Sequence, residues 1–309
     1  MTLANALLAA LILRMMLVAG VDRRRLWGWA CAPPLVLYVG HNWDMAAATL
    51  AVAALLLARA NRLVQAATAA ALGTAAKLFP VLALPLIGLT ALSKGRWRER
   101  LVRATLVSAA AIGAWLLVNL PVALLAPDNW SEFYRFSQER SGTAAASWDA
   151  LSNLGWLLIG NDDRNRYAAT LFVAGAAAIV ALGWRRHGDR PWILFTPVLA
   201  WFLLTNKVYS PQFDLWLYPL LLLTAPRLVP VALFAAGDIA AYFAEFWLLG
   251  SMEHGWPTAT FAHVAIAAGF RAAAMLWLIA DCVLRDAPGW IVKGDTGLTL
   301  SRPGQSGER

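Results

Sequence analysis

The chain has 309 residues, of which 60% are hydrophobic and only 14% are charged, whereas an ordinary globular domain carries about a quarter charged residues. This composition excludes a globular fold stable in water and predicts a protein that crosses a membrane several times. The net charge of +8 comes from short basic clusters without a continuous basic face, so nucleic acid is not an expected partner.

Eleven apolar runs follow one another along the chain, and runs of about 18 apolar residues are long enough to cross a bilayer as helices. Helices are expected because lipid cannot satisfy exposed backbone groups. The predicted fold class is all-α, a polytopic transmembrane helix bundle of about eleven segments. These segments are residues 3–20, 26–41, 44–58, 63–78, 80–93, 101–125, 167–184, 191–206, 213–225, 228–249 and 259–284.

Basic clusters alternate with loops that carry few basic residues. The positive-inside rule assigns the basic clusters to the cytoplasm and the other loops to the outer side of the plasma membrane. The N-terminus is then outside. Because the first run begins almost at Met1 and its positive charges follow it, we expect a chain that lacks an upstream helix and loop; a genuine outside N-terminus is the alternative. The basic clusters are 22–25, 59–62, 93–100, 184–190, 226–227 and the segment after Arg285.

Two regions outside the runs complete the predicted organisation. The bundle covers residues 1–286 and includes one long outer loop, 126–166, in which "DNWSEFYRFSQERSG" predicts an amphipathic helix on the membrane surface. Residues 287–309 contain Gly, Ser and Arg and predict a disordered cytoplasmic tail.

Two of the four lysines interrupt apolar stretches in a similar way. Lys77 in "KLFP" and Lys207 in "KVYSP" are each followed by an aliphatic residue, an aromatic residue and a nearby proline. Lysine binds phosphate as a compact point charge, and proline breaks helical geometry where a cavity is lined. The pair therefore predicts a site for an anionic ligand, with snorkelling of each amine to the interface as the alternative.

Further polar residues are predicted at the same membrane level. Asp44 is the candidate catalytic carboxylate, since a short outer loop can present it to a hydroxyl; capping of the following helix by Asn42 or Asp44 is the alternative. The other residues at this level are His41, Asn42, Asn206, Ser210, Gln212 and Asp214, and for Asp214 the alternative is a charge in the N-terminal turn of the following helix.

Charges elsewhere have simpler predicted roles. Arg135 and Arg140 in the outer loop are candidates for contact with an acceptor or with lipid phosphates, or are solvated charges. Asp238 and Arg271 fall near the middles of neighbouring helices and predict a structural ion pair, because a lone charge at that depth is costly. The four histidines are scattered, so no metal is expected, and no glycine-rich loop indicates a cofactor.

The order of three motifs resembles glycosyltransferase family 87. The motifs are Asn42-Trp43-Asp44, Lys77 with Phe79-Pro80, and the run from Lys207 to Phe213, and the resemblance extends over roughly residues 1–285. It implies a GT-C helix bundle that transfers a hexose, mannose in many relatives, from a polyprenyl-phosphate donor to a glycolipid or lipoglycan acceptor with inversion, among the membrane lipids.

The same resemblance implies roles for individual residues. Lys77 and Lys207 would stabilise the departing phosphate, where negative charge develops. His41, Asn42 and Gln212 would position sugar or phosphate, and Tyr209 and Ser210 belong to the same donor motif.

One departure from the family pattern bears on activity. The main catalytic aspartate of GT-C enzymes lies in the first outer loop and has no counterpart in this sequence, which makes Asp44 a supporting candidate. A transporter or flippase for an anionic lipid and an inactive paralogue are therefore alternative interpretations.

Overall fold

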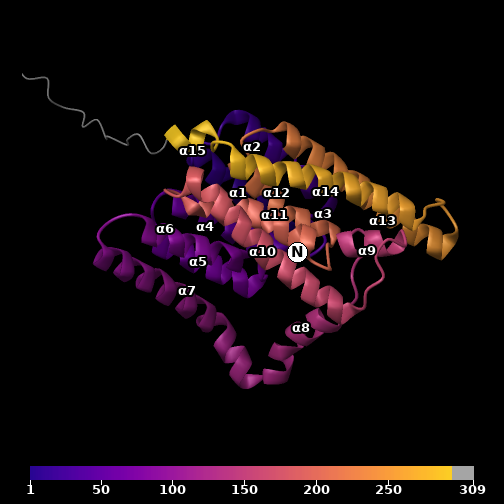
Figure 1. Cartoon of the computed structure of the whole chain (residues 1–309), viewed down its shortest axis with the longest axis horizontal. Helices are drawn as coiled ribbons and strands as arrows, with labels where there is room; N and C mark the ends of the chain where they lie inside the picture. The colour runs from indigo at the N-terminus through magenta and orange to yellow at the C-terminus, as the bar shows by residue number, and fades with distance from the viewer. Residues whose placement is uncertain (294–309) are drawn as a thin grey trace, which may run out of the picture.

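The computed structural model describes residues 1–293, and within them the chain is helical without strands (Figure 1). The predicted all-α, polytopic class is confirmed. The elements are α1 Thr2–Val18, α2 Arg23–Ala30, α3 Pro33–Tyr38, α4 Asp44–Arg59, α5 Leu63–Ala76, η1 Phe79–Leu82, α6 Ala83–Ser93, α7 Trp97–Leu125, α8 Pro127–Glu139, α9 Ser147–Asn153, α10 Asn161–His187, η2 Pro191–Leu194, α11 Phe195–Thr205, η3 Pro211–Phe213, α12 Asp214–Thr224, α13 Val229–His254, α14 Phe261–Leu284 and α15 Gly289–Lys293.

Each of the eleven predicted runs contains helix, but the runs are not all single membrane-length helices. Among the described residues, four helices are long and apolar enough to cross a bilayer: α7, α10, α13 and α14 with its extension to Val292. The predicted run 26–41 is divided into α2 and α3 at Pro33 and Pro34. Proline lacks the backbone N–H that a continuous helix needs, so a new helix begins there.

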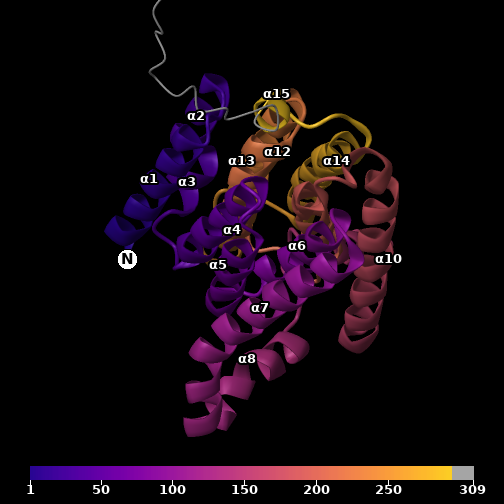
Figure 2. The same ribbon diagram turned by 90° about the vertical axis from the view of Figure 1, so that its left-hand side faces the viewer.

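Burial separates the helices at the centre of the bundle from those at its periphery. Every residue of α12 is buried, whereas α7 packs on α5 and α6 and buries only Val107. The remaining face of α7 is apolar and exposed, as expected for a helix surrounded by lipid. Figure 2 shows α2 and α15 at one end of the bundle and α8 at the other.

The C-terminal end of α12 is closed by residues from distant parts of the chain. Arg25 donates to the carbonyls of Leu222 (2.8 Å) and Ala225 (2.9 Å), and Trp290 Nε1 donates to the carbonyl of Leu223 (3.0 Å). The last carbonyls of a helix have no partner within it and need such donors.

Trp290 belongs to α15, which lies within the tail that the sequence predicts to be disordered. Trp290 and Ile291 are buried against the bundle, so the packed part of the chain extends beyond residue 287. The remainder of the predicted tail, 294–309, lies outside the described residues.

A close approach of α13 and α14 makes a first prediction. A Cβ atom on Gly237 would lie 2.8 Å from Arg271 Cα, so Gly237→Ala is expected to push the helices apart and lower the free energy of unfolding by about 1–3 kcal/mol. Thermal unfolding of the purified chain, followed by tryptophan fluorescence, measures this. Gly269→Ala is the matched control, since a Cβ there meets nothing within 4 Å; equal losses in both variants would contradict the prediction.

Candidate active site

An ion pair joins the start of α4 to the end of α5. Lys77 Nζ lies 2.8 Å from Asp44 Oδ1, with the Asp44 side chain fully buried and that of Lys77 23% exposed. Asp44 stands in the first turn of α4, where the helix dipole favours a negative charge. The N-cap position of α4 is Trp43, and the Asn42 side chain just before it accepts from the Asp44 backbone N–H at 2.9 Å, while the carboxylate of Asp44 faces the lysine.

Aromatic rings surround the Lys77 ammonium. Its Nζ lies 5.8 Å from the ring centre of Trp43, 5.9 Å from Phe213 and 5.7 Å from Trp216. Trp216 in turn stacks on Phe213 and Phe79, with centroids 3.8 Å and 4.6 Å apart. The faces of these rings attract a cation and hold the amine near the protein surface. The motifs around residues 42–44, 77–80 and 213 therefore meet in one place.

A cavity of about 350 Å³ adjoins Lys77. The amphipathic helix α8 forms one wall through Trp130, Phe133 and Tyr134, and α7 forms another through Trp115 and Asn119. Trp130 Nε1 donates to Asn119 Oδ1 at 3.2 Å and fixes the two walls to each other. The cavity thus combines one cation with aromatic and amide groups.

Lys207 lies at the same end of the bundle, where it binds the end of α8. Its Nζ donates to the Gln138 carbonyl at 2.8 Å and lies 3.4 Å from Asn161 Oδ1. Asn161 and Asn165 also donate to the Gln138 carbonyl, each at 3.0 Å. Lys207 is therefore part of the attachment of α8 and does not line the cavity of Lys77.

Burial lowers the pKa of Lys207, and the neighbouring charges of Arg140 and Arg164 lower it further. Both effects disfavour the charged form of the amine.

The other residues predicted for the donor make no contact with the Lys77 ammonium among the described residues. Ser210 precedes the turn η3 and Gln212 lies within it, next to Phe213, and both are half-buried. His41 is exposed and packs edge-on against Tyr38, with ring centroids 5.7 Å apart.

The two outer-loop arginines are held locally. Arg135 pairs with Glu132 on the exposed face of α8, and the Arg140 guanidinium lies 5.3 Å from the Phe136 ring centre. Neither lines the cavity beside Lys77.

Tyr209 belongs to a separate, buried polar cluster. Its hydroxyl donates to Asp214 Oδ1 at 2.5 Å, and the Arg271 guanidinium lies 3.8 Å from its ring centre. Arg271 Nη1 lies 3.7 Å from Asp214 Oδ2 and 3.9 Å from Asp238 Oδ1. The structure thus brings Asp238 and Arg271 together and adds Asp214 as a second carboxylate. Tyr209, which the resemblance assigns to the sugar donor, contacts this buried cluster.

The buried cluster also holds the outer loop. Arg271 donates to the Ala145 carbonyl at 3.1 Å, and Glu245 accepts from the Ala145 N–H at 3.0 Å. Thr143 Oγ1 accepts from the backbone N–H of Tyr209 at 2.9 Å. These contacts fix the backbone beside Lys207, and no local pattern in the sequence signals them because each joins segments far apart in the chain.

Within residues 1–293, no three His, Cys, Asp or Glu side chains are grouped so as to hold a metal ion.

The sequence pattern of glycosyltransferase family 87 matches residues 1–205. The chain belongs to this family. The match includes Asp44 and Lys77 and covers most of the helices that pack around them, so this membrane protein is a glycosyltransferase. The third motif, Lys207 to Phe213, lies just beyond the matched span. No curated protein and no solved structure matches the chain.

Proposed function

We propose that this family 87 glycosyltransferase transfers a hexose, mannose in the simplest case, from a polyprenyl-phosphate donor to a hydroxyl of a glycolipid. The observation that carries the proposal is the partly exposed ammonium of Lys77 beside an aromatic cavity. A lipid-linked sugar phosphate presents an anion and an apolar chain together, which suits a cation at the edge of an apolar bundle. A cavity of this size is within the usual range for small-molecule sites, about 300–1,000 Å³.

In the proposed mechanism Lys77 binds the donor phosphate. When the glycosidic bond breaks, negative charge grows on the phosphate oxygens, and a nearby fixed cation stabilises that charge more than it stabilises the bound donor. The acceptor hydroxyl oxygen attacks the anomeric carbon from the opposite face as the bond from that carbon to the phosphate oxygen breaks, which inverts the configuration. The hydroxyl proton is taken up by the released polyprenyl phosphate. The aromatic walls from α7 and α8 exclude water that would otherwise hydrolyse the donor.

Asp44 serves this mechanism best as a positioning residue. A general base must come within hydrogen-bond distance of the hydroxyl proton that it accepts, and the Asp44 carboxylate is fully buried behind Lys77. Its charge orients the ammonium toward the cavity.

Orientation in the membrane follows from the charges. The end of the bundle with Asp44, Lys77 and Lys207 has loops with few basic residues, and the opposite end carries the arginine clusters. Under the positive-inside rule the proposed site faces the extracytoplasmic side, where a lipid-linked donor is the natural sugar source.

Lys207→Ala tests the participation of the second lysine. Transfer from radiolabelled polyprenyl-phosphate mannose to lipid extract is expected to fall at least about tenfold in membranes carrying the variant, because the lost charge-assisted contact with the Gln138 carbonyl loosens α8, a wall of the Lys77 cavity. Lys207→Arg keeps the charge and is expected to retain part of the activity. Arg166→Ala, an exposed charge near the start of α10, is the control at the same end of the bundle. Wild-type transfer by Lys207→Ala would remove this lysine from the mechanism.

A deletion strain separates the enzyme from a lipid flippase. Mass spectrometry of its membrane lipids is expected to show a glycolipid shortened by one sugar. Accumulation of the complete glycolipid on the cytoplasmic side, with no shortened species, would instead favour transport.

A further inference from the structure

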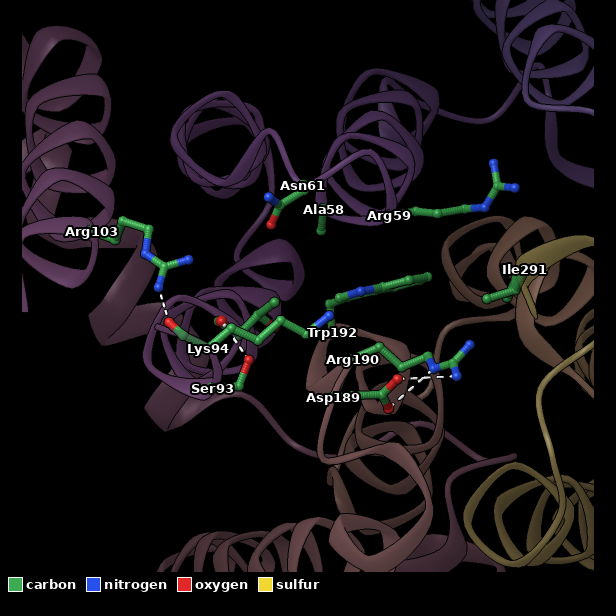
Figure 3. A pocket seen from close by; sticks show the side chains of 11 residues that line it. Ala58, Arg59, Asn61, Ser93, Lys94, Arg103, Asp189, Arg190, Trp192 and Ile291 are labelled. Carbon is green, nitrogen blue, oxygen red and sulfur yellow. Dashed lines mark hydrogen bonds and ion pairs between the residues drawn. The ribbon is translucent and has the colours of Figure 1, made fainter. Parts of the chain in front are cut away.

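We infer that the basic end of the bundle, opposite to Lys77, contains a separate binding site for a phosphate group, and we name it the basic pocket. It is a cavity of about 200 Å³ between the ends of several helices (Figure 3). Since a water molecule occupies about 30 Å³ in the liquid, the cavity has room for a phosphate group with its oxygens. Its lining residues are Ala58, Arg59, Asn61, Thr90, Ser93, Lys94, Arg103, Asp189, Arg190, Trp192 and Ile291.

The charge of the lining favours an anion. Four cationic side chains and one carboxylate line the pocket, which gives it a net charge of +3. The carboxylate, Asp189, is already paired with Arg190 at 3.1 Å. Arg59 binds the carbonyls of Ala19 and Trp290 and so fixes the wall formed by α15. These contacts fix the walls of the basic pocket formed by Arg59 and Arg190. Lys94 and Arg103 supply its other two cations.

Lys94 and Arg103 supply the cations on the outer side of the pocket. Arg103 donates to the Lys94 carbonyl and to that of Glu99, which holds the two residues together, as Figure 3 shows for the first contact. The Lys94 ammonium makes no polar contact with residues 1–293 and is available to an anion. Asn61 adds an amide to the lining from a backbone with φ of 56°.

The surroundings indicate where the phosphate comes from. Beside Arg103, α7 exposes Leu101, Val102 and Leu106, and α6 exposes Leu92. Acyl chains can lie along this apolar surface while the headgroup phosphate enters the pocket. Basic pockets between helices on the cytoplasmic side are suited to anionic lipid headgroups. A free phosphate ion would use the same cations without the apolar contacts.

Native mass spectrometry of the purified full chain tests the basic pocket. The probes are short-chain phosphatidylglycerol, phosphatidylcholine and inorganic phosphate, each titrated separately. The wild type is expected to bind phosphatidylglycerol more tightly than phosphatidylcholine, and Lys94→Gln with Arg103→Gln is expected to weaken that binding about tenfold. Arg98→Gln with Arg100→Gln is the matched control: it removes the same charge from the same segment, outside the pocket lining, and is expected to change the affinity less than about threefold.

Other outcomes are equally informative. Equal losses in the two double variants would show attraction by general surface charge and would overturn the site. Absence of any preference for phosphatidylglycerol, together with no binding of inorganic phosphate, would overturn it too. Binding of inorganic phosphate that depends on Lys94 and Arg103, without lipid preference, would support the site with a soluble ligand. Asn61→Asp supplies a second variant, since aspartate tolerates a positive φ, and its added negative charge is expected to weaken binding.

Discussion

Lys77→Met is expected to abolish sugar transfer and to destabilise the chain at the same time. Activity is lost because methionine has no charge to stabilise the departing phosphate. Stability falls because Asp44, fully buried beside the amine, is left without its partner; breaking a buried ion pair costs about 3–5 kcal/mol. Transfer assays in membranes and thermal unfolding in detergent measure the two effects separately.

A second substitution distinguishes folding from chemistry. In the double variant Asp44→Asn and Lys77→Met, neither member of this ion pair carries a charge, so most of the lost stability is expected to return. Transfer is expected to stay absent because the cation is still missing. Recovery of activity with the recovered fold would show that Lys77 acts only through stability and would refute its proposed contact with the donor.

Arg271→Leu is expected to lower stability more than either Gly237→Ala or Lys77→Met. Arg271 is almost fully buried and lies within 4 Å of two buried carboxylates, Asp214 and Asp238. Its removal leaves both without their cation, and the expected loss is at least about 3–5 kcal/mol. The loss is measured as a lower midpoint of thermal unfolding.

Arg186→Leu is the matched control for that experiment. Arg186 pairs with Asp286 at 2.7 Å, but both side chains are exposed, and exposed pairs contribute about 0–1 kcal/mol. Similar midpoints for Arg271→Leu and Arg186→Leu would mean that the buried cluster contributes no more than a surface ion pair. Asp238→Asn added to Arg271→Leu is expected to restore part of the stability.

The sequence predicts the helical class because apolar runs of this length have few other solutions in a membrane. The sequence also predicts α8, since the aromatic and charged residues of 128–142 are typical of an amphipathic helix. The run 26–41 is divided at two adjacent prolines, Pro33 and Pro34. Because they change the hydropathy of the run little, hydropathy alone predicts one continuous segment. The packing of α15 depends on Trp290 reaching a carbonyl of α12, a contact that composition does not signal.

The candidate site is predicted in the same uneven way. The common membrane level of Asp44 and Lys77 follows from the motifs, but their pairing follows from the packing of α4 against α5. The motifs place Lys207 beside Lys77, whereas in the structure it donates to the Gln138 carbonyl. The same level predicts Asp214 near the surface, but the approach of α12 and α14 places it beside Arg271. Contacts between distant segments are set by tertiary packing, which spacing along the chain does not encode.

The closed end of α12 has a consequence for biosynthesis. The donor Arg25 is synthesised 197 residues before its acceptor Leu222, whereas Trp290 follows its acceptor Leu223 by 67 residues. The innermost helix therefore leaves the ribosome before one of its donors exists. In a nascent chain the Leu223 carbonyl, in the last turn of α12, lacks this donor until residue 290 emerges, so this end of the bundle is completed only after α15 has been synthesised.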